Sequence, residues 1–569
     1  MHSRHSMICI LHGYLLDGSG SNLWTRSVAR ALVRDGATIH LVCQEPHPEK
    51  YDFISEAWEY GADGTVASVL ERETGYAGRC IMHQPGLGET LPVYVWDEYE
   101  EFEDVVPMTD MEDAVLEDYI HRNVEVVTRI VRAHGVTVMH ANHAVLMSVV
   151  AQRVSAWTGV PYVIMPHGSA LEYAVKPDAR LRRLAADAFE HAAGVLAISD
   201  EVARRVADVF GPAVTNLDAK LSRLDLGVDT AAFRPIEPEQ RAANVEHIGR
   251  LLASVSRGRS RAQAVTLTAG LNAGEAPAAV YERVGGYGAK LPDEDLEAKL
   301  DTIDWSTDRV LVFVGRLIAA KGIHAVIAAL PLIAASSPRA RLLVVGHGPL
   351  REPLEAFAHA LAHGDREVAA RVLDHAATIE AGEPEHLEAV PLFWQDLADR
   401  GQLDAYWAAA QRYLKPDTVI FTGYLTHREM AWLLPCCDTA VFPSMVVESG
   451  PLVFLEALAS GVFPIGTYFG GMKVKIDLAA PTLADDHGRL MKVRPDASAI
   501  VADIADVVPP ALEVASQYRG HLRRLAEEHY DWVPVARRLR QLMEEIAAGA
   551  SGAPAAGTSG VSGEPPVRR

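Results

Sequence analysis

Two carboxylates stand close together in the segment FPSMVVESGPLVFLEALASG, residues 442–461. Glu456 is the only charged residue of the apolar helix that this pattern predicts, and a helix that is apolar on all sides is a buried helix. A lone buried carboxylate is unfavourable unless it is paired, so Glu456 needs ribose hydroxyls or a structural arginine as its partner. Glu448 lies eight residues earlier. At ~1.5 Å per residue the separation is about 12 Å, enough to span a sugar and the ribose of its nucleotide.

The start of the same helix is a second ligand-binding feature. Pro451 suits the first turn, and Ser449 or Gly450 suits the cap. A helix that begins after a parallel strand presents free N–H groups at the carboxyl edge of the sheet. Those groups suit a phosphate or an anionic leaving group.

A basic pair follows another expected strand, in FVGRLIAAKG (313–322). Arg316 and Lys321 lie five residues apart on a strand-to-helix turn, where both can face one diphosphate. Arginine supplies a planar fork of donors, and lysine supplies a point charge. The competing interpretation is that both side chains are simply solvated.

The first strand is followed by a glycine-rich loop, ILHGYLLDGSGSNLW (10–24). Gly18 and Gly20 allow a backbone to approach a ligand closely. The spacing is not the G-x-G-x-x-G dinucleotide fingerprint, and Glu45 only loosely matches the acid that the fingerprint requires. A turn without a ligand explains the loop equally well.

Three histidines follow two adjacent strand ends in the first half of the chain. His167 is part of the segment YVIMPHGSALEY (162–173), and His140 and His143 follow the preceding strand. Active-site groups gather at the carboxyl ends of strands in open α/β sheets. A single histidine is more often structural, and the spacing of these three fits no standard metal motif. The one Asp-x-Asp, at Asp293 and Asp295, is expected to be solvated surface.

The elements that must position these residues form two successive arrays of short apolar strands alternating with helices. Such runs predict parallel sheets covered on both faces, and two arrays predict two doubly wound domains. The first array has expected strands at 7–11, 38–43, 92–96, 136–139, 162–165 and 195–198. The second has them at 309–314, 341–346, 418–423, 438–443 and 462–466.

Three segments fall outside these arrays. Residues 236–305 show little strand pattern and are expected to be an inserted linker. Residues 352–417 form a helical expansion, with Trp394 and Trp407 expected to anchor it to the domain core. Residues 548–569 are rich in Gly, Ala, Ser and Pro, a composition typical of disorder.

Composition narrows the classes of function. A formal net charge of −22 disfavours a nucleic-acid partner. The 5 cysteines show no paired metal-ligand spacing and favour a reducing compartment. No signal peptide and no apolar run of about 18 residues is found, which predicts a cytoplasmic protein. Peripheral contact with the inner membrane surface and a homo-oligomer stay open.

Taken together, these residues resemble the retaining glycosyltransferases of family 4 (glycosyl transferases group 1), which have the GT-B fold. The order and rough spacing agree over about 400 of the 569 residues. The matching motifs are the glycine loop 13–22, His167-Gly168, Gly227-Val228-Asp229, Arg316 with Lys321, Gly346-His347-Gly348-Pro349, Glu448 with Glu456, and Gly470-Gly471. His347 stands where the family often has Asp, and ESGP replaces the commoner Glu-Gly-Phe-Gly.

The resemblance implies roles for these residues. Arg316 and Lys321 would hold the diphosphate of a UDP- or GDP-type nucleotide-sugar, and Glu456 would bind its ribose. Glu448 and the amides of Gly450, Pro451, Leu452 and Val453 would face the donor sugar and the β-phosphate. His167 would contact the sugar near the reacting carbon, and the loop with Gly18 and Gly20 would close over the phosphate. No cofactor and no metal is expected, because the basic pair and the helix start neutralise the diphosphate.

The implied fold is α/β, with two Rossmann-like doubly wound parallel-sheet domains facing a central cleft. The expected acceptor-side domain covers residues 1–235, and the donor domain covers 306–528. A C-terminal helix at 529–547 is expected to return to the first domain. The acceptor, whether carbohydrate, lipid or small molecule, stays open.

Other functions stay open beside the transferase. They are a nucleotide-sugar epimerase or phosphorylase of similar shape, a non-catalytic nucleotide-sugar-binding protein and an NAD-dependent oxidoreductase. The intact set of Arg316, Lys321, Glu448 and Glu456 disfavours the binding protein. The broken dinucleotide fingerprint disfavours the oxidoreductase.

Overall fold

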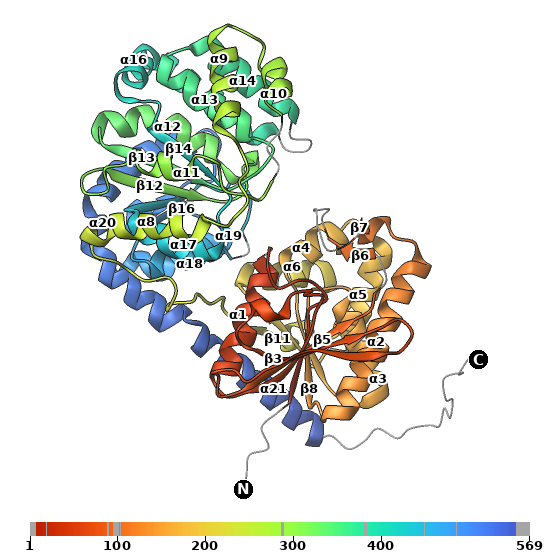
Figure 1. Ribbon diagram of the computed structural model, residues 1–569. Coiled ribbons are helices and arrows are strands. Elements are labelled where there is room, and N and C mark those ends of the chain that lie inside the picture. The colour runs from red at the N-terminus through yellow and green to blue at the C-terminus, as the bar shows by residue number, and fades with distance from the viewer. Residues whose placement is uncertain are drawn as a thin grey trace. The chain divides into compact units, whose positions relative to one another are not determined.

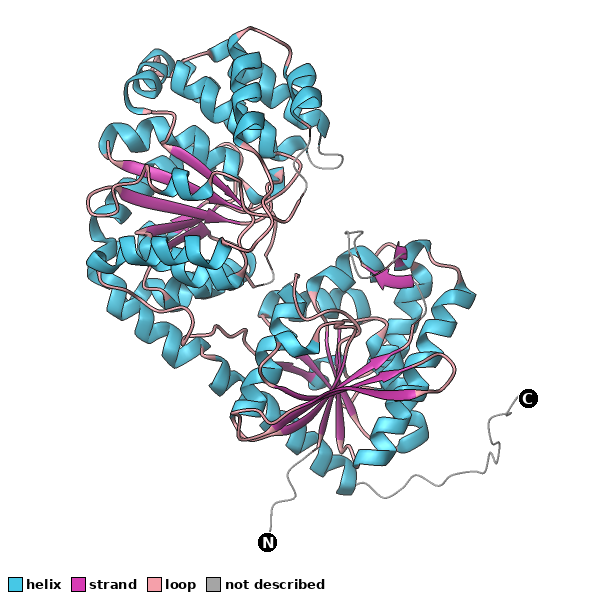
Figure 2. Ribbon diagram, viewed as in Figure 1, coloured by secondary structure: helices cyan, strands magenta, loops and turns pink. Residues whose placement is uncertain are grey.

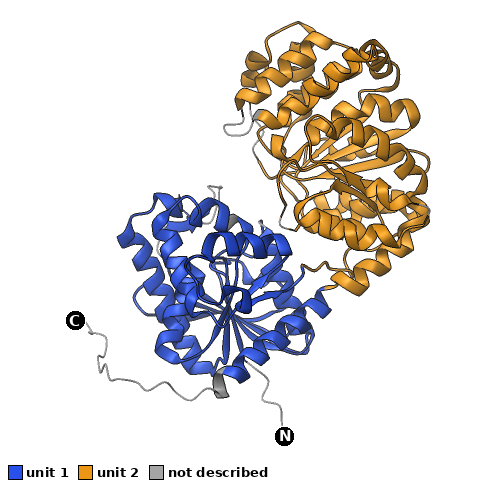
Figure 3. Ribbon diagram, turned by 180° about the vertical axis from the view of Figure 1, so that it is seen from behind, with its two compact units in different colours: residues 1–225, 532–569 blue, residues 226–531 orange. Residues whose placement is uncertain are grey.

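The protein divides into two compact units, described here from a computed structural model. Unit 1 comprises residues 1–225 and 532–569, and unit 2 comprises residues 226–531 (Figure 3). Residues 7–552 are described, apart from Ser19, 88–89, 95–101, 103, 286–288, 380–383, Ser449 and Asp485. The chain passes between the units twice, at 225–226 and at 531–532.

Unit 1 is built on one large sheet wrapped by helices (Figure 2). In the described residues its strand order is β11-β10-β9-β8-β1-β2-β5-β3-β4, and all neighbours are parallel except β3 and β4. All four residues of β1 are buried, as a strand covered on both faces requires. The strands are β1 (Ile8–Leu11), β2 (Thr38–Val42), β3 (Ile54–Tyr60), β4 (Val66–Glu71), β5 (Arg79–Pro85), β8 (Val138–Asn142), β9 (Tyr162–Met165), β10 (Gly194–Ala197) and β11 (Leu221–Arg223).

Helices close unit 1 on both sides of this sheet (Figure 1). A left-handed Gly135 ends α2 and a left-handed Gly159 ends α3, so the chain turns sharply into the next strand. The helices are α1 (Gly20–Arg34), α2 (Asp113–His134), α3 (Met147–Thr158), α4 (Gly168–Ala170), η3 (Leu171–Val175), α5 (Ala179–His191), α6 (Asp200–Phe210), α7 (Leu217–Lys220) and α21 (Trp532–Gly552).

The strand expected at 92–96 is not part of the main sheet. Residues Thr90–Val93 form β6, which pairs with β7 (Asp104–Pro107) in a separate two-stranded sheet. Residues 95 and 96 lie outside the described residues. The main sheet instead extends through β5, β3 and β4, none of which the sequence pattern revealed.

Unit 2 holds a second parallel sheet, with the order β14-β13-β12-β15-β16-β17 in the described residues. Apart from Arg309 and Arg341 near their starts, β12 and β13 are apolar and almost fully buried, so both faces of the sheet must be covered there. The strands are β12 (Arg309–Val314), β13 (Ala340–Val345), β14 (Val419–Gly423), β15 (Thr439–Phe442), β16 (Phe463–Thr467) and β17 (Lys492–Val493). The expected α/β class with two Rossmann-like sheets is confirmed.

The helices of unit 2 surround this sheet and extend beyond it (Figure 2). They are α8 (Arg241–Leu252), α9 (Arg261–Asn272), α10 (Pro277–Val284), α11 (Leu296–Leu300), α12 (Ile323–Ser336), α13 (Arg351–His363), α14 (Arg366–Ile379), α15 (Ala389–Asp399), α16 (Leu403–Tyr413), α17 (His427–Leu433), α18 (Leu452–Ala459), α19 (Gly470–Ala479) and α20 (Ile500–Tyr530). Trp407 is 4% exposed and Trp394 packs against it, so the helical expansion has its own aromatic core.

The sequence pattern predicted that residues 236–305 form a linker. This segment is instead an integral part of unit 2. Its helices α9 and α10 pack with α13 and α14 of the second expansion, forming one helical cluster (Figure 1). Asp293 N–H donates to the Thr422 carbonyl over 2.9 Å, and Tyr424 N–H donates to the Leu291 carbonyl over 3.0 Å. These bonds attach the segment to the end of β14.

The boundary predicted at residue 235 is also wrong, because the turn at 227–229 belongs to unit 2. Val228 N–H donates to the Tyr530 carbonyl over 2.6 Å, which fixes the turn to the end of α20. The final helix begins at Trp532 and belongs to unit 1, where Arg537 and Arg540 pair with Asp35. No helix in the described residues is long and apolar enough to cross a membrane.

Candidate active site

Three loops converge at the carboxyl edge of the unit 2 sheet, and glycines permit their close approach. Gly322 has φ +71°, and a Cβ atom there would lie 2.0 Å from the Pro443 carbonyl. A Cβ atom at Gly346 would lie 1.8 Å from the Gly315 carbonyl. The turn after β12 is therefore packed against the loops that follow β15 and β13, as only glycine allows.

Backbone hydrogen bonds fasten the same three loops together. Met445 N–H donates to the Ala320 carbonyl over 2.8 Å, and Leu317 N–H donates to the His347 carbonyl over 2.8 Å. The His347 ring meets the Tyr424 ring edge to face, with centroids 5.4 Å apart. The carboxyl edge of this sheet is thus a rigid platform for the side chains that project from it.

The predicted diphosphate-binding pair lies on this platform. Arg316 is exposed and forms no ion pair with the described part of the chain. Lys321 pairs with Glu448, and both side chains remain partly accessible, at 28% and 22%. The backbone of Glu448 is fixed because Gly471 N–H donates to its carbonyl over 2.7 Å. The structure therefore brings together three of the predicted residues.

The predicted helix start also lies here, with one correction. The helix α18 begins at Leu452, and Pro451 is its N-cap rather than a residue of its first turn. Pro451 has no N–H group and cannot donate a hydrogen bond to a phosphate, so only the amides of Gly450, Leu452 and Val453 can. Ser449, proposed as the cap, lies outside the described residues.

Glu456 is buried in α18, with 4% of its surface exposed. Among the described residues its partner is not an arginine but His427, whose Nε2 lies 2.8 Å from the carboxylate. His427 is 36% exposed and begins α17, directly after the capping residue Thr426. Sequence reasoning missed this histidine. The pattern THRE (426–429), which forms a capping box, is a signal that could have placed it at a helix start, but nothing in the sequence links that start to α18.

The Asp-x-Asp expectation is wrong. Asp293 is fully buried and pairs with Arg351 and Lys299 at 2.7 and 2.6 Å. Burial opposes its ionisation, but the two positive charges outweigh that effect and hold the pKa of Asp293 below its ordinary value. Asp293 therefore anchors the inserted segment to the core of unit 2.

In unit 1 a buried carboxylate fixes the glycine loop by a hydrogen bond. Glu45 is 4% exposed and accepts hydrogen bonds from Leu16 N–H at 3.1 Å and from the Tyr51 hydroxyl at 3.0 Å. Its oxygens are thus engaged by the protein and do not serve as a ribose ligand, which further disfavours the dinucleotide interpretation. Gly18 has φ +103°, and Gly20 is the first residue of α1.

His167 lies beside this loop within a group of buried histidines. It is 7% exposed, and its Nε2 lies 3.1 Å from the Asn142 Oδ1. The His143 ring lies 4.8 Å away, and His143 in turn stacks on His12 at 5.8 Å. Sequence reasoning grouped His140, His143 and His167 but missed His12, the first residue after β1.

These histidines are uncharged at neutral pH. Burial, and to a smaller extent the nearby imidazoles of His12 and His140, lowers the pKa of His167 to about 3. Burial likewise lowers the pKa of His12 to about 4 and that of His140 to about 3. The ring nitrogens of His140 and His143 have no hydrogen-bond partner among the described residues. No group of three or more His, Cys, Asp or Glu in the described residues could hold a metal ion.

Comparison with known families agrees with this arrangement. The model named glycosyl transferases group 1 matches residues 300–366 and 399–510, which carry the unit 2 platform. The model named glycosyltransferase family 4 matches residues 99–232, which include His140, His143 and His167. Together the two models cover more than half of the chain. This protein is a family 4 glycosyltransferase.

Solved structures show that the glycosyltransferase has the GT-B fold. It resembles sucrose-phosphate synthase from Thermosynechococcus elongatus with a TM-score of 0.52 and 16% identity, covering 96% of this chain and 100% of that one. It also resembles the starch synthase IV catalytic domain from Arabidopsis thaliana, bound to ADP and acarbose. That match has a TM-score of 0.51 and 10% identity, covering 96% and 100% of the two chains. No curated protein sequence matches.

Proposed function

We propose that this glycosyltransferase moves a sugar from a nucleotide-diphosphate sugar to an acceptor hydroxyl, with retention of the anomeric configuration. The observation that carries the proposal is the platform of unit 2, where Arg316, Lys321 and the start of α18 share one sheet edge. A diphosphate there meets a guanidinium, an ammonium and free helix N–H groups, which are the complementary charges for it.

The ion pair between Lys321 and Glu448 is compatible with a ligand-free donor site. The diphosphate offers Lys321 a second anionic partner, while Glu448 is held through its backbone and faces the same space. Glu448 then lies where it can accept hydrogen bonds from donor-sugar hydroxyls. Glu456 and His427 form the polar pair assigned to the ribose.

The chemistry proposed is positioning together with charge stabilisation. The bond from the anomeric carbon to the β-phosphate oxygen breaks, and the nucleoside diphosphate leaves as an anion; preorganised donors stabilise the charge that develops on it. The front-face course, in which the leaving phosphate helps to deprotonate the acceptor, follows from the family resemblance. His167, uncharged and fixed by Asn142, is assigned to hydrogen bonding with the sugar.

A calorimetric panel tests the donor assignment. UDP, GDP and ADP are titrated into the protein in a chelating buffer and again with magnesium; ADP is included because the starch synthase neighbour binds it. We expect one nucleotide to bind without added metal. Binding that disappears in chelator would overturn the metal-free assignment, and binding of none would overturn the donor site.

Retention needs a separate measurement. The nucleotide-sugar of the matching base is incubated with a panel of acceptors, and the proton NMR coupling of the new anomeric centre is compared with that of the donor. We expect the configuration to be preserved. An inverted product would leave the glycosyltransferase assignment intact and remove the retaining course.

A further inference from the structure

We propose that a pocket in unit 1, between the tip of the β3–β4 hairpin and one face of α2, binds an uncharged sugar unit of the acceptor. The proposal rests on the proposed function and adds an acceptor class, a glycan longer than one sugar. None of the predicted donor-site residues lines this pocket.

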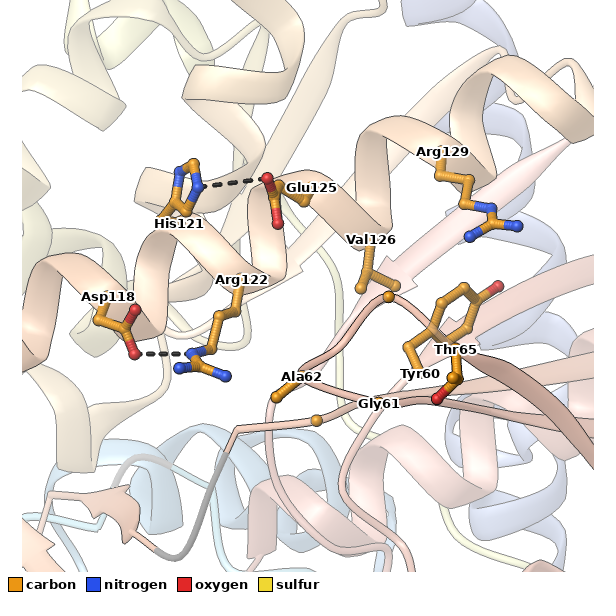
Figure 4. Close-up of a pocket in the computed structure, with 12 residues that line it drawn as sticks. Tyr60, Gly61, Ala62, Thr65, Asp118, His121, Arg122, Glu125, Val126 and Arg129 are labelled. Carbon is orange, nitrogen blue, oxygen red and sulfur yellow. Dashed lines mark hydrogen bonds and ion pairs between the residues drawn. The ribbon is translucent and has the colours of Figure 1, made fainter. Parts of the chain in front are cut away.

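The pocket has a volume of about 300 Å³ and two unlike walls (Figure 4). One wall is the backbone of the hairpin tip, Tyr60–Thr65, together with Gly86 after β5. Gly64 has φ +83° and no atom near its missing Cβ, so the turn leaves room for a ligand. This volume is at the small end of ligand pockets and suits one sugar ring.

The other wall is a row of paired polar side chains on α2. Arg122 Nε lies 2.6 Å from Asp118, and His121 lies 3.2 Å from Glu125, each pair one helical turn apart (Figure 4). Both carboxylates keep acceptor capacity, and the guanidinium keeps donors. A sugar hydroxyl both donates and accepts, so such pairs can bind neighbouring hydroxyls at once.

The charge balance favours an uncharged ligand. With Arg129 at the far end of the row, two guanidinium groups face the two carboxylates of Asp118 and Glu125. An anion would be attracted by the two guanidinium groups and repelled by the two carboxylates, and interaction energies of opposite sign at similar distances cancel. A neutral hydroxylated ring can form hydrogen bonds with both kinds of group.

The aromatic side of the pocket is rigid. The Tyr60 hydroxyl lies 2.9 Å from the Nδ1 of His83, and the Nε2 of His83 lies 2.9 Å from the Nδ1 of His40. Both histidines are 1% exposed, so this chain anchors the ring from inside the sheet. The Arg129 guanidinium lies 6.0 Å from the centre of the same ring. A preorganised wall lowers the entropic cost of binding.

The position of the pocket indicates which part of an acceptor it holds. Tyr60 ends β3 and Pro85 ends β5, at the same carboxyl edge as the glycine loop after β1. Along that edge β5 and β3 are two and three strands from β1, or roughly 10–14 Å at ~4.8 Å per strand. That distance exceeds one sugar ring, so the pocket holds a unit remote from the reacting hydroxyl.

An array of defined neutral, acidic and phosphorylated glycans, from mono- to tetrasaccharides, tests the proposal with the full-length protein. The variants are Asp118→Ala, at an exposed position of α2, and Arg122→Ala, at a half-buried one. The control is Arg132→Ala on the same helix, which is exposed and does not line the pocket. The thermal shift with UDP, GDP and ADP is measured in parallel as a check of folding and of the donor site.

We expect the wild-type protein to bind at least one neutral oligosaccharide, with at least tenfold weaker binding in both pocket variants and unchanged binding in Arg132→Ala. The proposal is overturned if no neutral glycan binds, if only charged glycans bind, or if the pocket variants bind normally. A wild-type protein that shows no nucleotide shift would instead overturn the donor site. The two failures are therefore distinguishable.

Discussion

The two units place their functional groups at the same edge of the same kind of sheet but use opposite electrostatics. Unit 2 buries charged pairs, such as Arg351 with Asp293 and Arg241 with Asp438. Unit 1 buries histidines whose pKa values are lowered, so that they are neutral. A doubly wound sheet therefore fixes where a site lies, and the side chains at the strand ends decide whether it attracts an anion or offers neutral hydrogen bonds.

Acidification is the strongest test of this contrast. A histidine whose pKa is lowered on folding stabilises the protein above its unfolded pKa of about 6.5, and that stability is lost as the pH falls toward the folded value. His12, with a folded pKa of about 4, alone costs on the order of 2 kcal/mol at pH 5. His140 and His167, at about 3, add to that loss.

Unit 2 responds differently at Asp293, a buried carboxylate whose pKa is lowered. Asp293 keeps its stabilising charge until the pH falls below the ordinary value of 3.8, although His324, with a pKa of about 4, shares the sensitivity of unit 1. We therefore expect hydrogen exchange at pH 5, corrected for intrinsic rates, to show opening of β8 and β9 before β12 and β13. In His140→Phe, which keeps the ring contact with Trp24, the difference should shrink. Simultaneous opening of both units would contradict the comparison.

Lys321→Ala should give the largest effect on activity. Removing the ammonium deletes a charge from the proposed diphosphate site and takes away the ion-pair partner of Glu448. Loss of one preorganised charge-stabilising group costs about 10²–10³ in rate. Steady-state kcat/KM for the donor measures the effect, with the exposed Lys415→Ala as the matched control. An unchanged kcat/KM would return the lysine to the solvated interpretation.

Glu456→Ala should weaken donor binding by about 1.5–3 kcal/mol, the usual contribution of hydrogen bonds to a charged group. His427→Ala should have a smaller effect, because the carboxylate keeps its ligand when the histidine is lost. The double variant decides between the two interpretations of the pair. If His427→Ala lowers the melting temperature as much as Glu456→Ala while nucleotide affinity is preserved in both, the pair is structural.

The sequence predicted the sheets well where strands are continuous apolar runs, such as β1, β9 and β12. It missed β3 and β4, whose glutamates interrupt the apolar pattern; β4 pairs only with β3, and β3 joins the sheet by pairing with β5, a contact distant in the sequence. The same cause explains which residues of the candidate site could be grouped from the sequence. Arg316 and Lys321 share one turn and could be grouped, whereas His427 reaches Glu456 from another loop.

Asp293 shows a second limit of sequence reasoning. It stands in a charged string that is typical of exposed surface, and its partner Arg351 lies 58 positions away. Burial of a charge depends on whether a counter-charge arrives from elsewhere, which local pattern does not record. The inserted segment was therefore predicted as a linker when it is part of the unit 2 core.

The smallest predicted effect concerns the uncharged histidines of unit 1. His167→Ala should lower turnover roughly tenfold, the equivalent of one net hydrogen bond of about 1–1.5 kcal/mol, and should change donor affinity less. The reason is that His167 is uncharged and belongs to unit 1, whereas the charges proposed to bind the diphosphate belong to unit 2. His167→Asn is the informative companion, because an amide can still donate and accept a hydrogen bond without a titratable proton. If turnover recovers in the asparagine variant and its pH profile matches the wild type, His167 acts by hydrogen bonding. Turnover that is lost equally in both variants, with a changed pH profile in the asparagine variant, would instead assign proton transfer to the imidazole, and an unchanged turnover in His167→Ala would remove the residue from the site.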